Sequence, residues 1–452
     1  MSKAGIVFYA PSQLNSFAKS NVLKKLKENY DLRIFSTRIP IADSLEKDYR
    51  EIVELITIPE MVRKVSGFVQ MVSLWRFRDR SMNHLVRAMA SFGTKKEQDS
   101  WKCVVVSEMK ISYWKRLTVR FASLTLVFVC LRLLERLLLE FFAAKKFKLY
   151  FKGVRALLLP FSGHIGADFG NLVWVARRLS IPVIGLQENW DNLATKTFIL
   201  EEPDYFLVWG DQSAGHIRSV HRLFDVKVSV VGSPRFSPYF QDRRAIPAVS
   251  TESGKRVDLR DRQFILVAGT GDGIDDVMLV RLVANAFSPK VRKRISANLT
   301  IVYRPHPMTR TAVDYTTLLH EFPSMLIDAG PESRSFGHHN ALVKSAALVI
   351  NHFSTLTVES LLCGTPVMVP LFLGRSEARY RYEHILNEWH HMMGVGLISR
   401  IKTPRTPEEF TEHLIEALQE DASEVGPDIN LDWICKKSDY VEEVSRFINL
   451  NL

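Results

Sequence analysis

Short apolar runs alternate with amphipathic segments along most of the chain. The first series is the apolar run "GIVFYA", then "SFAKSNVLKKLKENY" with apolar residues near every third or fourth position, then the apolar run "DLRIFST". Apolar runs bounded by polar turns are typical of buried strands, and the longer period is typical of an amphipathic helix. The order predicts a β-α-β unit and therefore a parallel sheet with a right-handed crossover.

The alternation resumes twice further along the chain. It covers residues 156–236 and again 263–370, and between them residues 241–262 are polar, contain Pro, Gly and Ser, and lack periodicity. Such a stretch is typical of a linker. We therefore predict an α/β protein of two Rossmann-like halves, with a helix-rich, basic insert at about 60–150 in the first half.

Composition supports a folded protein of two domains. At 452 residues, with 46% hydrophobic and 24% charged residues, the chain exceeds what one core usually supports. Its four cysteines lack CxxC spacing, which argues against a zinc site and a disulfide framework and fits a reducing compartment. The N-terminus lacks the apolar length and cleavage site of a signal peptide, so we expect a cytoplasmic protein.

The net charge of +11 predicts acidic partners, such as nucleotides, nucleic acid or an anionic membrane. The sequence contains no RNP-like string, zinc-finger spacing or basic-region heptad, so we expect no nucleic-acid partner. A nucleotide ligand together with an anionic membrane surface accounts for the charge better than a basic surface without a partner.

The segment 121–143 is strongly apolar. Only about eleven residues pass before Arg132, fewer than the roughly 20 that cross a bilayer, so we expect no transmembrane helix. As a helix it would carry Arg132, Arg136 and Glu140 in one narrow stripe, with Glu135 beside them. Two interpretations stay open: a helix lying in the membrane interface, or a helix buried in the N-terminal domain. Basic residues flank both ends of the segment: Lys115, Arg116, Arg120, Lys145, Lys146 and Lys148.

Polar turns follow several strands of the second half, and open α/β sheets bind ligands at such carboxyl ends. In "GTGDG", residues 269–273, glycines would let the backbone approach a phosphate, although an ordinary tight turn explains them equally well. In "RPHP", residues 304–307, two prolines fix the chain around His306, which with Arg304 can donate to a phosphate. A structural turn is the alternative.

The segment "NHFSTLTVESLLCGTPVMVP", residues 351–370, predicts a short helix between two strands. Ser354 or Thr355 would cap this helix, and the same helix N-terminus suits an anion. Glu359 lies among leucines, and no Ser or Thr stands three residues before it, so a capping box does not explain it. A ribose diol or an arginine would satisfy its carboxylate.

The order and spacing of "RPHP" and this segment resemble nucleotide-sugar glycosyltransferases of the B-type fold. "ESLLCGTPV" is similar to their donor-ribose helix, in which the acid matching Glu359 contacts the ribose. The histidine–proline pair and the later Ser-Thr pair resemble bacterial sialyltransferases, polysialyltransferases and Kdo transferases, where positions matching His306 and Ser354–Thr355 hold the nucleotide phosphate. "VVGSPRF", residues 230–236, resembles the Gly-x-Pro-Arg turn of polyglycerophosphate transferases.

The resemblance implies two Rossmann-like domains that face each other across a cleft. It implies an acceptor-binding domain at 1–245, a nucleotide-sugar-binding domain at 262–430, and a segment 431–452 whose helix packs back on the first domain. The donor-binding residues expected from the turns and the resemblance together are Gly269, Thr270, Gly271, Arg304, His306, Ser354, Thr355 and Glu359.

The first domain should then supply the acceptor site and the catalytic base. Its two polar loops, "PFSGHIGADFGN" and "LQENWDNLATKT", each follow an apolar strand. Asp168 in the first loop is the preferred base, because flanking glycines would leave its carboxylate exposed, and His164 would orient or replace it. Asp191 in the second loop is the next candidate. Trp190 would stack on a sugar ring or belong to the core, and Asp191 with Asn192 would otherwise cap a helix.

Together these features predict an inverting, metal-independent glycosyltransferase that builds a bacterial surface polysaccharide, such as capsule or lipopolysaccharide, at the inner face of the cell membrane. The donor would be a nucleotide sugar, CMP-activated in preference to UDP-activated, and the acceptor a glycan or lipid-linked glycan. No DxD sequence occurs, which favours chemistry without a metal, and we expect no other cofactor. The alternatives are a glycerol-phosphate transferase, a sugar-nucleotide epimerase of the same fold, and an inactive scaffold docked on the membrane.

Overall fold

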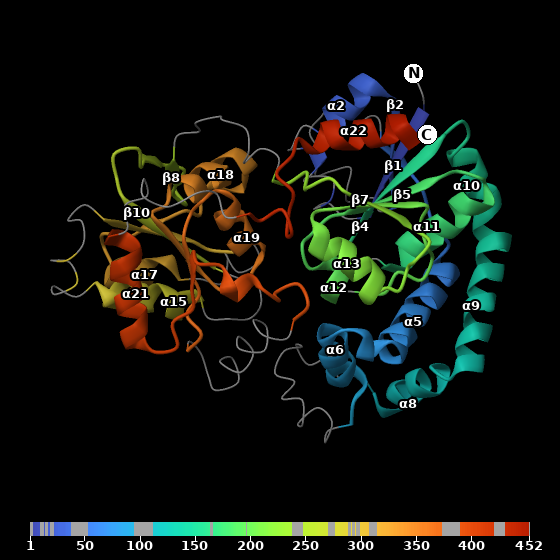
Figure 1. The fold of residues 1–452 in the computed structure, drawn as a ribbon, viewed down its shortest axis with the longest axis horizontal. Helices are drawn as coiled ribbons and strands as arrows, with labels where there is room; N and C mark the ends of the chain where they lie inside the picture. Colours follow the sequence, from blue (N-terminus) through green and yellow to red (C-terminus); the bar gives the residue numbers. More distant parts are fainter. Residues whose placement is uncertain are drawn as a thin grey trace. The chain divides into compact units, whose positions relative to one another are not determined.

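The computed structural model divides the chain into two compact units, drawn in Figure 1. Unit 1 comprises Met1–Pro238, Trp389–His391 and Leu431–Leu452, and unit 2 comprises Tyr239–Glu388 and Met392–Asn430. Each unit contains a parallel sheet flanked by helices, so the predicted α/β class with two Rossmann-like domains is confirmed. The structure describes residues 3–9, 13, 17–18, 22–37, 53–94, 112–162, 166–195, 197–236, 247–269, 276–287, 291, 294, 299–306, 314–372, 389–419 and 430–451.

Unit 1 is built on a seven-stranded sheet whose neighbouring strands are all parallel. The strand order is β3-β2-β1-β4-β5-β6-β7, so it reverses between β1 and β4. Ligands of open α/β sheets usually bind outside the carboxyl ends at such a reversal. The strands are β1 (Lys3–Phe8), β2 (Asp31–Ser36), β3 (Val53–Leu55), β4 (Ala156–Phe161), β5 (Val183–Gln187), β6 (Tyr205–Val208) and β7 (Lys227–Val230).

Alternate residues of β1 belong to different hydrophobic cores, as the two-residue period of a strand requires. Ile6 and Phe8 pack with α2 (Val22–Asn29) and α22 (Tyr440–Asn451), which lie on one face of the sheet (Figure 1). Val7 and Tyr9 pack on the other face, with α11 (Gly166–Arg178) and α13 (Asp211–Ser219). The C-terminal helix α22 thus belongs to unit 1, where the phenol of Tyr30 donates to Asn449 Oδ1 at 2.8 Å.

The insert between β3 and β4 is helical and packs on the α11 side of the sheet (Figure 1). Its apolar segment does not form one helix, because the chain turns by 91° between α8 and the continuous helical run that follows. Among the described residues no single helix is long and apolar enough to cross a membrane, whereas this bent pair passes the same test of length and composition. The elements of the insert are α5 (Glu60–Arg76), η1 (Arg78–Arg80), α6 (Met82–Phe92), α8 (Tyr113–Ala122), α9 (Thr125–Leu139), the π-helical turn η2 (Glu140–Ala144) and α10 (Lys145–Tyr150).

Unit 2 contains a six-stranded parallel sheet in the order β12-β11-β10-β13-β14-β15, which reverses between β10 and β13. We expected an irregular linker at 241–262, and this is wrong for part of it, because β8 (Ala248–Ser250) and β9 (Arg256–Asp258) form an antiparallel pair. The strands of the sheet are β10 (Phe264–Ala268), β11 (Thr300–Arg304), β12 (Leu326–Ile327), β13 (Leu348–Asn351), β14 (Val367–Met368) and β15 (Ile401–Lys402).

Helices cover both faces of the unit 2 sheet. On one face α15 (Asp276–Ala286), α17 (Tyr315–Glu321) and α21 (Pro407–Gln419) share a hydrophobic core with the strands. On the other side of the sheet lie α18 (Phe336–Ser345) and α19 (Thr355–Leu362) (Figure 1). Two short 3-10 helices, η4 (Pro331–Arg334) and η5 (Val395–Leu397), complete the regular structure described in this unit.

Candidate functional site

The predicted donor residues of unit 2 lie at neighbouring strand ends. The register pairs Ala268 of β10 with Arg304 of β11 on one side and with Asn351 of β13 on the other. The residues that follow these positions therefore emerge at one edge of the sheet, at the point where the strand order reverses. This brings Gly269, His306 and the N-terminus of α19 together. Thr270 and Gly271 lie outside the described residues.

Gly269 is required by its surroundings. Its amide donates to Arg304 O at 3.0 Å, and a Cβ at this position would lie 2.1 Å from Asp276 Oδ2 and 3.0 Å from His306 N. No larger residue fits unless Asp276, the first residue of α15, moves away. Sequence reasoning missed Asp276, whose only signal is its position at a helix start, and this buried carboxylate now belongs to the candidate site.

The N-terminus of α19 is capped by its own side chains. Ser354 Oγ accepts from Leu356 N at 3.3 Å, and Ser354 N donates to Thr357 Oγ1 at 3.4 Å, so the capping box is closed by a threonine. The amide of Asn351 donates to both hydroxyls. Thr355 is the first residue of the helix. The expected capping role of Ser354 is therefore present, and binding of an anion by the remaining N–H groups stays a prediction.

Glu359 is paired with a histidine. Its side chain is fully buried in α19, and Nε2 of His339, on α18, lies 2.7 Å from Glu359 Oε2. We expected a ribose or an arginine as its partner, and the structure adds His339, which the sequence did not reveal. Glu359 is fully buried, and its Oε2 is bound to the imidazole of His339. A ribose diol that contacts this carboxylate would therefore share it with His339.

The guanidinium of Arg304 binds other residues of unit 2. Its guanidinium forms an ion pair with Asp328, and its Nη2 donates to Ser333 O at 2.7 Å. Asp328 is fully buried and also binds His338 at 2.8 Å and Ser250 N at 3.0 Å. These polar contacts hold the pKa of Asp328 below its ordinary value although burial opposes the shift. Arg304 therefore links β8 and η4 through Asp328 and Ser333, and its expected contact with a phosphate stays a prediction.

In unit 1 the preferred base, Asp168, lies at the other reversal of strand order. It occupies the first turn of α11, directly after β4 and next to the end of β1. We expected flanking glycines to expose its carboxylate, and this is wrong, since Asp168 is only 2% exposed. The reason is that Asp168 already belongs to the helix and lies on its buried side. Arg63 of α5 forms an ion pair with Asp168, Nε to Oδ1, at 3.8 Å. His164 lies outside the described residues.

Tyr9 is a site residue that the sequence did not reveal. It directly follows β1 on the α11 side, is buried, and its hydroxyl has no hydrogen-bond partner among the described residues. Burial raises the pKa of Tyr9 well above its ordinary value, and the nearby charge of Asp168 raises it further. Tyr9 is thus a neutral phenol with an unused donor beside the candidate base. The only sequence signal was its position at the end of the first apolar run.

The polar side chains of the loop after β5 bind other residues of unit 1. Trp190 is buried and donates from Nε1 to Gln212 Oε1 at 3.0 Å, so the core alternative is correct and stacking on a sugar is wrong. Asp191 Oδ2 accepts from Thr195 Oγ1 at 3.0 Å, and the buried Asn192 donates to Phe161 O at 2.7 Å. Asp191 thus binds the last residue of the short helix α12 (Asn192–Thr195), and Asn192 ties the start of that helix to the end of β4. Asp191 remains half-buried and keeps a place among the candidate bases.

The Gly-x-Pro-Arg turn lies beside this loop. Gly232 has a φ of +80°, and a Cβ there would lie 2.6 Å from Lys436 O, so the position requires glycine. Nη1 of Arg235 lies 3.5 Å from Asn189 Oδ1, at the carboxyl ends of β7 and β5 respectively. The turn therefore brings one further cation toward the loop after β5. Among the described residues, no three His, Cys, Asp or Glu side chains are placed to hold a metal ion.

Comparisons with known proteins inform the fold. No protein-family model matches the sequence, and a search of curated proteins finds no relative. A solved structure of a UDP-GlcNAc 2-epimerase from Methanocaldococcus jannaschii is similar, with a TM-score of 0.52 and 11% identity over 99% of this chain and 100% of that chain. The UDP-GlcNAc 2-epimerase from Neisseria meningitidis, solved with UDP-GlcNAc, gives a TM-score of 0.51 at 11% identity over 99% and 100% of the two chains. These likenesses show that the chain has the two-domain B-type fold.

Proposed function

We propose that this protein is a glycosyltransferase that moves a sugar, with inversion, from a nucleotide-activated donor to a growing surface glycan. One observation carries the proposal. In unit 2 the end of β10, the Pro-flanked end of β11 and the N-terminus of α19 meet at the reversal of strand order, which suits an anionic nucleotide. The likeness in fold to two enzymes of nucleotide sugars supports this ligand class.

The donor's phosphate would be held by three groups. His306 would donate a hydrogen bond, Gly269 would allow close approach of the backbone, and the first N–H groups of α19 would add the positive end of the helix dipole. His306 is half-exposed at this edge, whereas Arg304 is occupied by Asp328. We favour a CMP-activated acidic sugar as donor, because the histidine–proline and Ser-Thr pairs resemble sialyl and Kdo transferases, with a UDP-sugar as the alternative.

Unit 1 would supply the acceptor site and the base. Asp168 would take the proton of an acceptor hydroxyl, whose oxygen then bonds to the anomeric carbon while the bond from that carbon to the phosphate breaks. The electron pair of the broken bond leaves with the nucleotide. Arg63 favours the ionised carboxylate that a base requires, and the neutral phenol of Tyr9 can donate to the acceptor oxygen.

Two other activities fit the same fold. The two structures compared above are UDP-GlcNAc 2-epimerases, so an epimerase that acts on the donor alone is one alternative. A glycerol-phosphate transferase is favoured by the Gly-x-Pro-Arg turn, where Arg235 reaches the loop after β5. A scaffold without catalysis would bind nucleotide and turn nothing over.

Nucleotide release measured with and without oligosaccharide acceptors separates these functions. The protein would be incubated with CMP-, UDP- and GDP-sugars and with CDP-glycerol, and products followed by chromatography and mass spectrometry. Glycosyl transfer predicts acceptor-dependent release of nucleotide from one donor and an acceptor heavier by one sugar. Isomerised donor without acceptor would show an epimerase, transfer from CDP-glycerol would show a glycerol-phosphate transferase, and binding without turnover would show a scaffold.

A further inference from the structure

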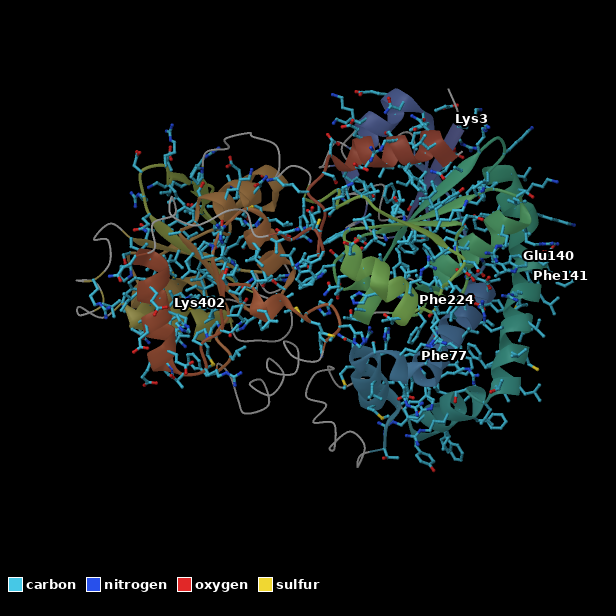
Figure 2. The ribbon with its side chains drawn as sticks, in the orientation of Figure 1. Lys3, Phe77, Glu140, Phe141, Phe224 and Lys402 are labelled. Atoms are coloured by element: carbon cyan, nitrogen blue, oxygen red, sulfur yellow. The ribbon has the colours of Figure 1, made fainter. Side chains whose placement is uncertain are left out.

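The helical run α8–α9–α10 exposes an unusual amount of apolar surface. Leu126 on α9 is 76% exposed, and Phe141 on the π-helical turn is 74% exposed, at the outer edge of unit 1 in Figure 2. A single exposed leucine is ordinary, but a contiguous patch of them marks a surface that is covered by something else. The exposed large apolar side chains of this run are Tyr113, Trp114, Leu117, Phe121, Leu124, Leu126, Val129, Leu133, Leu134, Leu137, Phe141, Phe142 and Leu149.

The exposed side chains of α9 form one stripe. Leu126, Val129, Leu133 and Leu137 recur every three or four residues, so they lie along one side of the helix. The opposite side is buried against α5 and α11, with Phe128 and other side chains in the core. The buried interpretation is therefore correct for one side of α9, and the membrane interpretation stays a prediction for the other side, which is apolar and exposed.

Ion pairs fix which side of α9 faces inward. Arg132 binds Glu135, which is buried, and also Glu201 in the segment before β6. Arg136 Nη2 lies 3.0 Å from Glu201 Oε1. This charged cluster lies between α9 and the body of unit 1, so the apolar stripe cannot turn inward without breaking several buried ion pairs.

The charges around the stripe have one sign. Residues 112–152 contain nine basic residues and only two acidic ones, Glu135 and Glu140. Glu135 is buried with Arg132, and Glu140 is bound to Arg178 at 3.0 Å. Four lysines of the segment that ends the run, Lys145, Lys146, Lys148 and Lys152, are exposed, and Lys115 is exposed near its start. Both carboxylates of this run are thus paired with an arginine, and the excess charge of the run is positive.

We propose that the α8–α9–α10 run docks this protein on an anionic lipid bilayer, lying in the plane of the interface. The apolar stripe would enter the boundary between headgroups and acyl chains, and the flanking lysines would contact the headgroups. Tyr113 and Trp114, both exposed at the start of α8, are the residue types that prefer this boundary. A second copy of the chain is the other possible occupant, and like charge at both ends of the stripe disfavours it. The proposal does not depend on the proposed catalytic activity.

Co-sedimentation of the full chain with vesicles tests this proposal. Vesicles of phosphatidylcholine alone would be compared with vesicles that also contain phosphatidylglycerol, at low and high salt. We expect the protein to pellet with the anionic vesicles at low salt and to be released by high salt. The double variant Leu133→Glu with Leu137→Glu should bind at least ~10-fold more weakly, because it places two charges in the stripe.

The control is Phe224→Glu, which puts one such charge on an exposed aromatic of unit 1 outside the run and should leave binding unchanged, whereas Leu137→Glu alone should weaken it. A fluorophore on Cys130, which is exposed on α9, gives a second readout in a chain whose other cysteines are serine. Its emission should shift to the blue when anionic vesicles are added.

Equal binding of the double variant and the wild type would overturn the proposal, as would a dimer in solution that the double variant converts to a monomer. Retention on vesicles at high salt and alkaline pH would contradict docking in the plane of the interface.

Discussion

His339 and Glu359 form a buried pair that joins α18 to α19, with Nε2 of the histidine 2.7 Å from Oε2 of the glutamate. The pair lies one helical turn beyond the capped N-terminus of α19, where the donor's phosphate is proposed to bind. A buried carboxylate requires a compensating hydrogen-bond donor, and His339 supplies one to Glu359. The two residues are therefore expected to act as one unit.

A double-mutant cycle measures this coupling. Glu359→Gln and His339→Gln should each destabilise the protein, and the double variant should be more stable than the sum of the two by about 1–3 kcal/mol. The free energies of unfolding would come from urea denaturation monitored in unit 2. Additive effects would show that the two side chains do not stabilise each other.

Arg304 should behave as a structural residue. Arg304→Ala leaves the buried Asp328 without its guanidinium, which should lower the free energy of unfolding by about 3–5 kcal/mol. Arg281→Ala is the control, because Arg281 pairs with Glu321 on the surface and its loss should change little. A variant Arg304→Ala that unfolds like the wild type but binds nucleotide weakly would support the phosphate role instead.

Unit 1 should lose stability in mild acid because of buried histidines. Burial, reinforced by neighbouring histidines, lowers the pKa of His216 to about 3 and that of His221 to about 3. In the unfolded chain their pKa is near 6.5, so between pH 6.5 and 3 the unfolded state binds more protons and stability falls as the pH falls. Near pH 5 each histidine makes the unfolding free energy of unit 1 fall by about 1.4 kcal/mol for each pH unit of acidification.

The variant His221→Gln tests this slope. Plots of unfolding free energy against pH from urea titrations should be shallower for the variant than for the wild type between pH 5 and 6.5. Parallel plots for His221→Gln and the wild type would mean that His221 is protonated in the folded state.

Asp168 should be needed for turnover and not for donor binding. Asp168→Asn keeps the shape of the side chain and removes its ability to accept a proton, so kcat should fall by about 10²–10⁴-fold while nucleotide affinity persists. Tyr9→Phe removes only the unused hydroxyl and should lower kcat by a smaller factor without destabilising the fold. If Asp191→Asn abolishes transfer and Asp168→Asn does not, the base lies on the loop after β5.

Most of the sheet could be predicted from the sequence, because buried parallel strands appear as short apolar runs. The strand β1 overlaps the predicted run "GIVFYA", and β4, β10, β11 and β13 lie in the two later stretches of alternation. Their order places the candidate residues at two reversals of strand order. The hairpin of β8 and β9 was missed because its strands are short and carry no period. It is held by a distant residue, Asp328, which accepts from Ser250 N at 3.0 Å.

The errors at the site have the same physical origin. Glycines around Asp168 suggested an exposed loop, but Arg63, from an insert helix far away in the sequence, completes a buried environment for the carboxylate. Arg304 and Glu359 have partners, Asp328 and His339, that come from other elements of unit 2 and that the local sequence did not show. The local sequence shows which side chains are polar, whereas tertiary contacts determine which of them remain available to bind a ligand.

Isothermal titration calorimetry with free nucleotides tests the central claim most directly, since binding at the carboxyl ends of β10, β11 and β13 underlies every function proposed for unit 2. CMP, CDP, UDP and GDP would be titrated into the wild type, His306→Ala and the surface control His320→Ala. The account predicts that one nucleotide, CMP in preference to the others, binds the wild type and the control equally and His306→Ala at least ~10-fold more weakly. Absence of binding by all four nucleotides, or equal affinity in His306→Ala, would contradict it.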